Sequence, residues 1–88
     1  MENIVSISCG QYFSFALDSF GNVFSFGNND YGQLGTGNTS MQLSPYNITF
    51  FTQTVTQIAT GNSHSLVLTK TGDIYSFGDN SVNFLNLF

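Results

Sequence analysis

Residues 23–35 have the sequence VFSFGNNDYGQLG, in which a short apolar run ends at a glycine and leads into a turn-rich stretch. The same kind of run returns 51 residues later, as IYSFGDN at residues 74–80. When the comparison is extended without a gap, nine of the 23 positions from Ile7 to Asn29 are identical to their counterparts. The chain is therefore an internal repeat of about two copies.

Each copy has the alternation expected of a β-hairpin. Phe13, Phe15 and Leu17 alternate with smaller residues, a loop containing Gly21 follows, and residues 23–26 form a second β-rich run. The second copy repeats this order at residues 65–69 and 74–77, on either side of Gly72. Residues 4–8 and 54–60 supply a further strand. Residues 28–45 form a long turn-rich connection with the only proline, and no stretch has the period of a helix.

A strand-rich unit that recurs about every 50 residues is typical of β-propeller blades, which stack because one small sheet cannot bury both faces alone. We expect an all-β chain of two consecutive blades, each an antiparallel hairpin or meander unit, in an incomplete ring. The first repeat with its long connecting loop takes residues 1–53, and a second, truncated repeat takes residues 54–88.

Composition excludes several classes of function. With Lys70 as the only basic residue and a formal net charge of −4, the chain lacks the Lys and Arg clusters that bind nucleic acid, so no nucleic-acid contact is expected. No apolar run approaches the roughly 20 residues that span a membrane, and Met1-Glu2-Asn3 does not open a signal peptide. Cys9 has no partner for a disulfide within the chain. We expect an intracellular protein, cytoplasmic or nuclear, with no membrane contact.

The residues quoted above resemble the repeats of the regulator-of-chromosome-condensation family. The most specific piece is Tyr31-Gly32-Gln33-Leu34-Gly35 after the Phe26-Gly27-Asn28-Asn29 string, whereas the second copy has Asn83-Phe84-Leu85-Asn86 in place of Gly32-Gln33-Leu34-Gly35. The positions that match the repeat signature are Gly10, Gly21, Gly27, Gly32, Gly35, Gly61, His64, Gly72 and Gly78. Because members of this family close a ring of about seven blades, the resemblance implies a fragment of a larger propeller, a chain that assembles with other chains, or a remnant.

No residue pattern predicts catalysis, a metal or a cofactor. His64 is the only imidazole and has no clustered Cys or second His, so we interpret it as structural. A set of Ser63 or Ser65 with His64 and Asp73 lacks a nucleophile elbow, and Gly32, Gly35 and Gly37 lack the Lys-Ser/Thr of a phosphate-binding loop. Cys9 is interpreted as a small buried strand residue. We expect no enzyme activity and no small-molecule substrate.

The function predicted is protein–protein interaction, with a protein partner or the missing blades as the binding partner. Propellers present their loops to partners, so the predicted contacts are Asp30, Tyr31, Gln33 and Asp79, and the negative charges of Asp30 and Asp79 favour a basic partner. One alternative, implied by the resemblance alone, is part of a guanine-nucleotide exchange factor for a small GTPase. A second is a non-functional, truncated remnant.

The aromatic residues fall into two groups. Those inside the repeats are expected in the blade core: Phe13, Phe15, Phe24, Phe26, Tyr75 and Phe77. Those outside the repeats are harder to bury in two blades and, if exposed, mark where a partner packs: Phe50, Phe51, Phe84 and Phe88.

Overall fold

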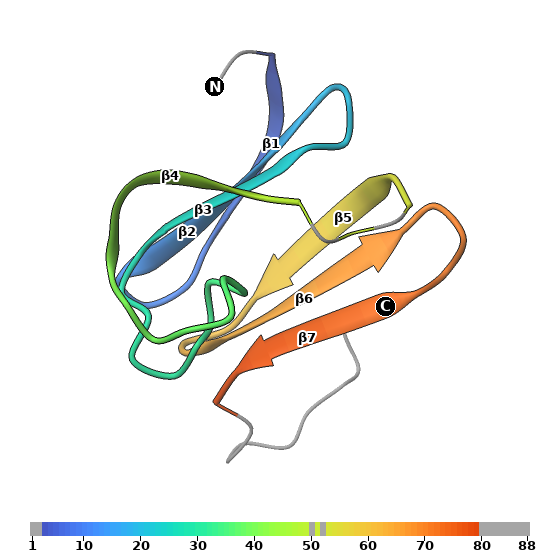
Figure 1. The fold of residues 1–88 in the computed structure, drawn as a ribbon. Coiled ribbons are helices and arrows are strands. Elements are labelled where there is room, and N and C mark those ends of the chain that lie inside the picture. The colour runs from blue at the N-terminus through green and yellow to red at the C-terminus, as the bar shows by residue number, and fades with distance from the viewer. Residues whose placement is uncertain (1–2, 50, 52, 80–88) are drawn as a thin grey trace.

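The computed structural model describes residues 3–49, 51 and 53–79, which form two antiparallel sheets (Figure 1). The first sheet has the order β1 (Ile4–Cys9), β2 (Phe13–Asp18), β3 (Val23–Gly27) and β4 (Gln42–Ile48). The second has the order β5 (Val55–Thr60), β6 (His64–Thr69) and β7 (Ile74–Gly78). The described residues contain no helix, so the predicted all-β class is confirmed, and the two sheets do not close a ring.

The repeat in the sequence is reproduced strand by strand. Each end of β5, β6 and β7 lies 51 residues after the corresponding end of β1, β2 and β3. The pairing is repeated as well, since Phe13 faces Gly27 and His64 faces Gly78 at the start of the two hairpins. Gly21 and Gly72, in the turns at the far end of these hairpins, have φ values of 87° and 93°, as their turn positions predict. The predicted boundary at residues 53 and 54 falls in the connection between β4 and β5, and the division into repeats there stays a prediction.

The core lies between the two sheets. One face of the first sheet presents Phe13, Phe15, Leu17 and Val23, all at most 5% exposed. Leu34 joins this cluster from the β3–β4 loop, and further members come from β4, β5 and β6: Ile48, Val55 and Val67. The rings of Phe13 and Phe15 meet edge to face, with centroids 6.2 Å apart. Burial of these side chains, each contributing about 1.5–3 kcal/mol, holds the two sheets together.

The sheets are also joined where the C-terminal ends of β1 and β5 approach each other. The hydroxyls of Ser8 and Thr60 share a hydrogen bond of 2.7 Å, and the backbone N–H of Gln11 donates to the carbonyl of Asn62 at 3.0 Å. These bonds fix how one sheet sits on the other.

β4 corrects the prediction for residues 28–45. We expected a turn-rich connection as far as Pro45, but residues from Gln42 onward form a strand that pairs with β3, with an irregularity in the pairing between Ser25 and Gly27. Proline lacks an N–H donor and is tolerated at the edge of a sheet beside such an irregularity. β4 is an edge strand of the first sheet, so Pro45 does not interrupt it.

Three predictions of burial were also wrong. Cys9 is exposed, because it lies on the face of β1 that points away from the second sheet. Phe24 and Phe26 are half-buried outside the core cluster, since they point to that same outer face. Phe51 is half-buried and packs edge to face on Tyr75, with ring centroids 5.0 Å apart. Phe50, Phe84 and Phe88 lie outside the described residues.

Candidate functional site

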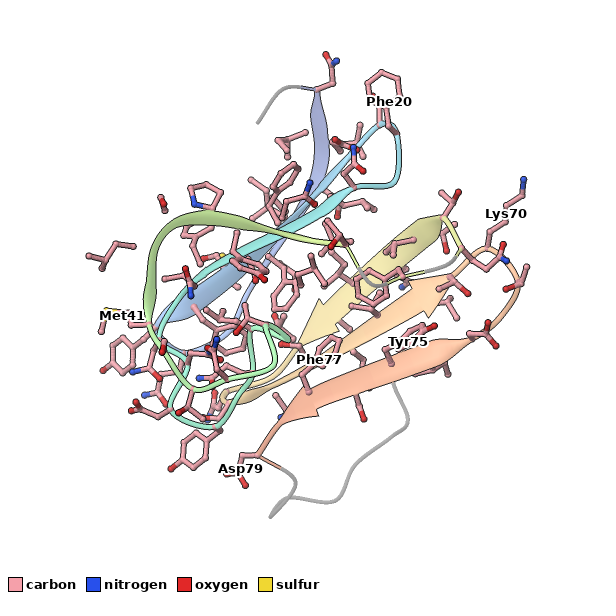
Figure 2. The ribbon with its side chains drawn as sticks, viewed as in Figure 1. Phe20, Met41, Lys70, Tyr75, Phe77 and Asp79 are labelled. Carbon is pink, nitrogen blue, oxygen red and sulfur yellow. The ribbon has the colours of Figure 1, made fainter. Side chains whose placement is uncertain are left out.

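The predicted contact residues lie at one end of the two sheets. This end is built from the β1–β2 and β5–β6 turns, the long β3–β4 loop and the residue that follows β7. Figure 2 shows Met41 and Asp79 at this end, with Phe20 and Lys70 in hairpin turns at the opposite end. The end with the long loop carries Asp30 and Asp79 and no basic residue, whereas the opposite end carries Asp18 and Asp73 together with Lys70, the only basic residue of the chain.

Asn29 organises the long loop. Its side chain is 1% exposed, and its Nδ2 lies within 3.1 Å of three acceptors: Thr36 Oγ1 and the carbonyls of Asn38 and Ser40. Its Oδ1 accepts the backbone N–H of Leu34 at 3.0 Å. One buried amide therefore satisfies backbone groups from both arms of the loop, which is why the loop folds without strands of its own.

A second network orders the loop between Asn28 and Gln33. Asn28 Oδ1 accepts the backbone N–H of Asp30 at 3.0 Å and Gln33 Nε2 at 3.3 Å. Gln33 Oε1 in turn accepts the backbone N–H of Tyr31 at 3.0 Å. Gln33 is 1% exposed, which corrects its place among the contact residues: its side chain is engaged inside the loop, and we assign it to the loop's fold.

The backbone of Gln33 and Leu34 is held between the two sheets by two serines. Ser25 Oγ of β3 donates to the carbonyl of Leu34 at 2.9 Å, and Ser65 Oγ of β6 donates to the carbonyl of Gln33 at 2.8 Å. Both serines are fully buried. The Gly-Gln-Leu-Gly motif is thus a wedge between blades, and Tyr31, just before it, is exposed.

Asp30 and Tyr31 are the outward-facing part of the loop. Asp30 is exposed and Tyr31 is 57% exposed. Asp79 is half-exposed, and its backbone N–H donates to Ser63 just as that of Asn28 donates to Tyr12. Asp79 therefore occupies the position of Asn28 in the repeat, not that of Asp30, and adds a negative charge to the same end.

Tyr12 is a residue of this end that the sequence analysis missed. It is 77% exposed, and its φ of 68° places a bulky side chain in the left-handed region. One feature of the sequence could have indicated it. The counterpart of Tyr12 in the second copy is Ser63, so the repeat itself does not require an aromatic residue at this turn position. We call Tyr12, Asp30, Tyr31 and Asp79 together the loop surface.

A shallow hollow adjoins the long loop. Its volume is about 380 Å³. It is lined by Gly32, Gly35, Gly37, Asn38, Thr39 and Phe77. A Cβ on Gly35 would come within 3.0 Å of the Phe77 ring. Gly35 therefore allows the loop backbone to lie close to Phe77 of β7, and the hollow is mostly apolar.

His64 has a structural position in the described part of the chain. It is the first residue of β6, and its ring lies against Gly61 where the ring of Phe13 lies against Gly10 in the first copy. A side chain on either glycine would overlap the ring above it. Among the described residues, no three His, Cys, Asp or Glu side chains gather as a metal-binding group.

The pKa of the Asp18 carboxyl departs from its ordinary value. Burial alone would raise the pKa of its carboxyl, but hydrogen bonds from the Asn22 side chain and from the backbone N–H groups of Asn22, Phe20 and Gly21 lower the pKa below the usual 3.8. The carboxylate closes the β2–β3 turn, with Oδ1 accepting from Asn22 N at 2.8 Å and Phe20 N at 2.9 Å. Its role is in the hairpin turn at the opposite end from the loop surface.

The described residues include no helix long and apolar enough to cross a membrane.

Comparison with protein families finds a match over most of the chain. A model described as the regulator of chromosome condensation (RCC1) repeat matches residues 21–68, and a second model of the same description matches residues 4–33 and 55–83. Human Protein RCC2 is 44% identical over 78 residues, which is 88% of this chain and 15% of that protein. Human probable E3 ubiquitin-protein ligase HERC4 is 43% identical over 91 residues, covering 96% of this chain and 8% of the ligase.

Solved structures show the same similarity. The crystal structure of human WBSCR16 matches with a TM-score of 0.83 and 29% identity, over 89% of this chain and 20% of that one. The crystal structure of Prp20p from Saccharomyces cerevisiae matches with a TM-score of 0.79 and 28% identity, over 90% of this chain and 19% of that one. Prp20p is described together with its binding properties to Gsp1p and histones. This chain therefore spans a fifth or less of the length of each of these proteins.

Proposed function

The chain belongs to the regulator of chromosome condensation (RCC1) repeat family, and from that premise we propose that it is a protein-interaction module in which the loop surface contacts the partner. We infer that it works as part of a larger propeller in an intracellular setting, cytoplasmic or nuclear. The strands and the buried wedge hold the loop in place, while the exposed side chains beyond it make the contact.

The observation that supports this proposal is that the β3–β4 loop has buried side chains that hold it together and an exposed side chain between them. Asn29 and Gln33 are each 1% exposed and use their side chains inside the loop, whereas Tyr31, between them, is 57% exposed. A loop that is rigidly held from within and presents an aromatic side chain outward is suited to binding, since little conformational entropy is lost on contact. Tyrosine is also among the residues enriched at interface hot spots.

The charge of the loop surface favours a basic partner. Asp30 and Asp79 contribute negative charge at this end, and the chain's one lysine lies at the other. Complementary charge raises association rates and selects partners more than it raises affinity. The description of Prp20p as binding histones, which are rich in Lys and Arg, supports histones as the first probe.

Fluorescence anisotropy with labelled core histones tests the proposal. Tyr31→Ala removes the aromatic contact, and we expect it to weaken binding by roughly 5- to 30-fold, the effect of losing about 1–2 kcal/mol at an interface hot spot. Asp30→Asn should weaken binding about 1.4- to 5-fold, and less at high salt, as for an exposed ion pair.

Phe20→Ala is the matched control, because Phe20 is 74% exposed but lies at the opposite end. It should leave the affinity unchanged. Equal losses in Phe20→Ala and Tyr31→Ala would show that binding does not use the loop surface. Absence of histone binding at any concentration would reject the basic-partner form of the proposal.

Guanine-nucleotide exchange remains the alternative, proposed from the family and from the likeness to Prp20p alone. We place that activity in a complete ring and expect this chain not to accelerate nucleotide release from a small GTPase. Measurable exchange by the isolated chain would favour the alternative.

A further inference from the structure

The first half of β4 is only loosely tied to the strand beside it. The pairing of β4 with β3 is regular from Ile48 to Tyr46 and resumes only at Gln42, so residues 43–45 stand opposite a single residue of β3. Such a bulge takes the extra residues out of the regular ladder of an edge strand. Residues 43–45 are all exposed, Leu43 by 90%. This segment is therefore extended, open to solvent and weakly held.

The bulge contains the chain's one Ser-Pro pair, Ser44-Pro45. Both side chains are exposed, and within the part of the chain that the structure describes the Ser44 hydroxyl makes no hydrogen bond. Proline has no N–H to donate and biases the residue before it toward an extended backbone. The pair thus presents a hydroxyl on an extended, accessible stretch of chain, in the form in which an enzyme can bind it.

The outer edge of β4 stays open when the chain is part of a larger propeller. The sheets of a propeller surround a central channel. The edges of the two sheets that approach each other are β1 and β5, so these strands are nearest the axis and β4 lies at the rim (Figure 1). Neighbouring blades stack on the faces of a sheet, so the rim is the part of a blade that they cover least.

A phosphate on Ser44 would add negative charge at the end with the long loop. Gln42, at the start of β4, pairs with Gly27 at this end. Met41, which Figure 2 shows there, is three residues from Ser44, or roughly 10 Å of extended strand. Lys70, the only basic residue of the chain, lies at the opposite end. About 1.5–2 negative charges would therefore face solvent without a basic side chain of the same chain to pair with.

We propose that Ser44 is a phosphorylation site for a proline-directed serine/threonine kinase. The Oγ of Ser44 attacks the γ-phosphorus of ATP and forms a new P–O bond, while the bond from that phosphorus to the bridging oxygen breaks and releases ADP. The hydroxyl proton passes to the catalytic aspartate of the kinase. Pro45 follows the acceptor, where a residue without an N–H leaves no unpaired donor in the kinase cleft. This site follows from the geometry of β4 and does not depend on the loop surface.

A kinase assay on the folded 88-residue chain tests the proposal, with a purified mitogen-activated protein kinase and ATP. Fragment mass spectrometry locates the phosphate. We expect one phosphate per chain, on Ser44, at a rate within about tenfold of the rate for a free peptide of residues 40–49. If the kinase reached Ser44 only in the unfolded chain, the rate would be at least about 100-fold lower than for the peptide, and this result would overturn the proposal.

Two variants check that the Ser-Pro pair is what the kinase recognises. Pro45→Ala keeps the acceptor hydroxyl but removes the proline, so it should lose nearly all phosphorylation. Ser40→Ala, which removes an exposed serine outside the pair, should be phosphorylated like the wild type. Circular dichroism establishes that both variants are folded. A phosphate on another residue, or phosphorylation of Pro45→Ala as fast as that of the wild type, overturns the proposal.

The consequence for binding rests on the proposed function. In the histone anisotropy assay, the chain phosphorylated on Ser44 should bind core histones roughly 2- to 10-fold more tightly than the unmodified chain, and less so at high salt. Ser44→Ala treated with the same kinase should show no change. Equal affinities of the phosphorylated and unmodified chains would overturn this consequence. Histones that bind neither form would count against the proposed function, and the kinase assay would still decide the site.

Discussion

The hydroxyl of Ser65 offers a direct test of how the loop wedge joins the two blades. Ser65 is fully buried on β6, and its Oγ donates to the carbonyl of Gln33, 32 residues away, at 2.8 Å. Ser65→Ala would leave that carbonyl buried without this donor. The loss of a buried partner costs about 1–3 kcal/mol, which for a domain of this size lowers the melting temperature by roughly 4–8 °C per kcal/mol.

The chain contains its own matched control. Ser14 is the counterpart of Ser65 in the first copy, but it is half-buried and its hydroxyl makes a 3.5 Å contact with the sulfur of Cys9, an exposed interaction. Ser14→Ala should change the free energy of unfolding by no more than about 0.5 kcal/mol, as is usual for a substitution that leaves no buried group unsatisfied.

Urea unfolding followed by circular dichroism measures both variants, at a protein concentration where the chain is monomeric. We expect the midpoint to fall for Ser65→Ala and to stay near the wild-type value for Ser14→Ala, with an unchanged dependence on urea in both. Equal losses in the two variants would refute the reasoning, because they would show that the serine contributes through strand structure and not through its bond to the loop.

Three further predictions concern the loop and the turns. Asn29→Ala should lower the free energy of unfolding, measured in urea, by at least about 2 kcal/mol, because it leaves several buried loop groups without partners. A loss below about 0.5 kcal/mol would contradict the role of Asn29 in ordering the loop. The pKa of Asp18 is lower in the folded than in the unfolded chain, so the carboxylate stabilises the fold above pH 3.8, and this contribution disappears as the pH falls through the folded pKa. The difference in unfolding free energy between wild type and Asp18→Asn should therefore shrink from roughly pH 5 to pH 2. A difference that stays constant over this range would contradict the stabilising role of the carboxylate. Gly35→Ala and Gly37→Ala both place a side chain at positive φ, at a cost of about 1–2 kcal/mol, but only the first meets the Phe77 ring, so thermal unfolding should show the larger loss for Gly35→Ala.

Much of the strand structure could be read from the repeat. Identical glycines and alternating apolar residues at a spacing of 51 predicted the β2–β3 and β6–β7 hairpins, and the structure confirms both hairpins, with each strand one residue longer than predicted. The family could be recognised for the same reason, and the RCC1 repeat matches confirm it. Local backbone preference and two-residue periodicity decide these features, and both are properties of short stretches of sequence.

The candidate site was predicted less completely. Asp30, Tyr31 and Asp79 lie at the end that carries the long loop, and their contact with a partner stays a prediction. Gln33 was wrongly grouped with them, because a polar residue in a glycine-rich turn carries no sign that the turn will be wedged between two sheets. Tyr12 was missed because its positive φ arises from the tight turn between β1 and β2.

The sequence by itself determined the all-β class, the 51-residue repeat and the positions of the two hairpins, since each depends on residues close together in the chain or on their copies 51 residues away. Only the tertiary structure decided that residues 42–48 form an edge strand and that Leu34 and the backbone of Gln33 lie in the contact between blades. These features depend on contacts that the second sheet and the edge of β3 make with the loop, whose own sequence has no periodic pattern. Burial is a property of the assembled sheets, and a loop residue acquires it only when both sheets are in place.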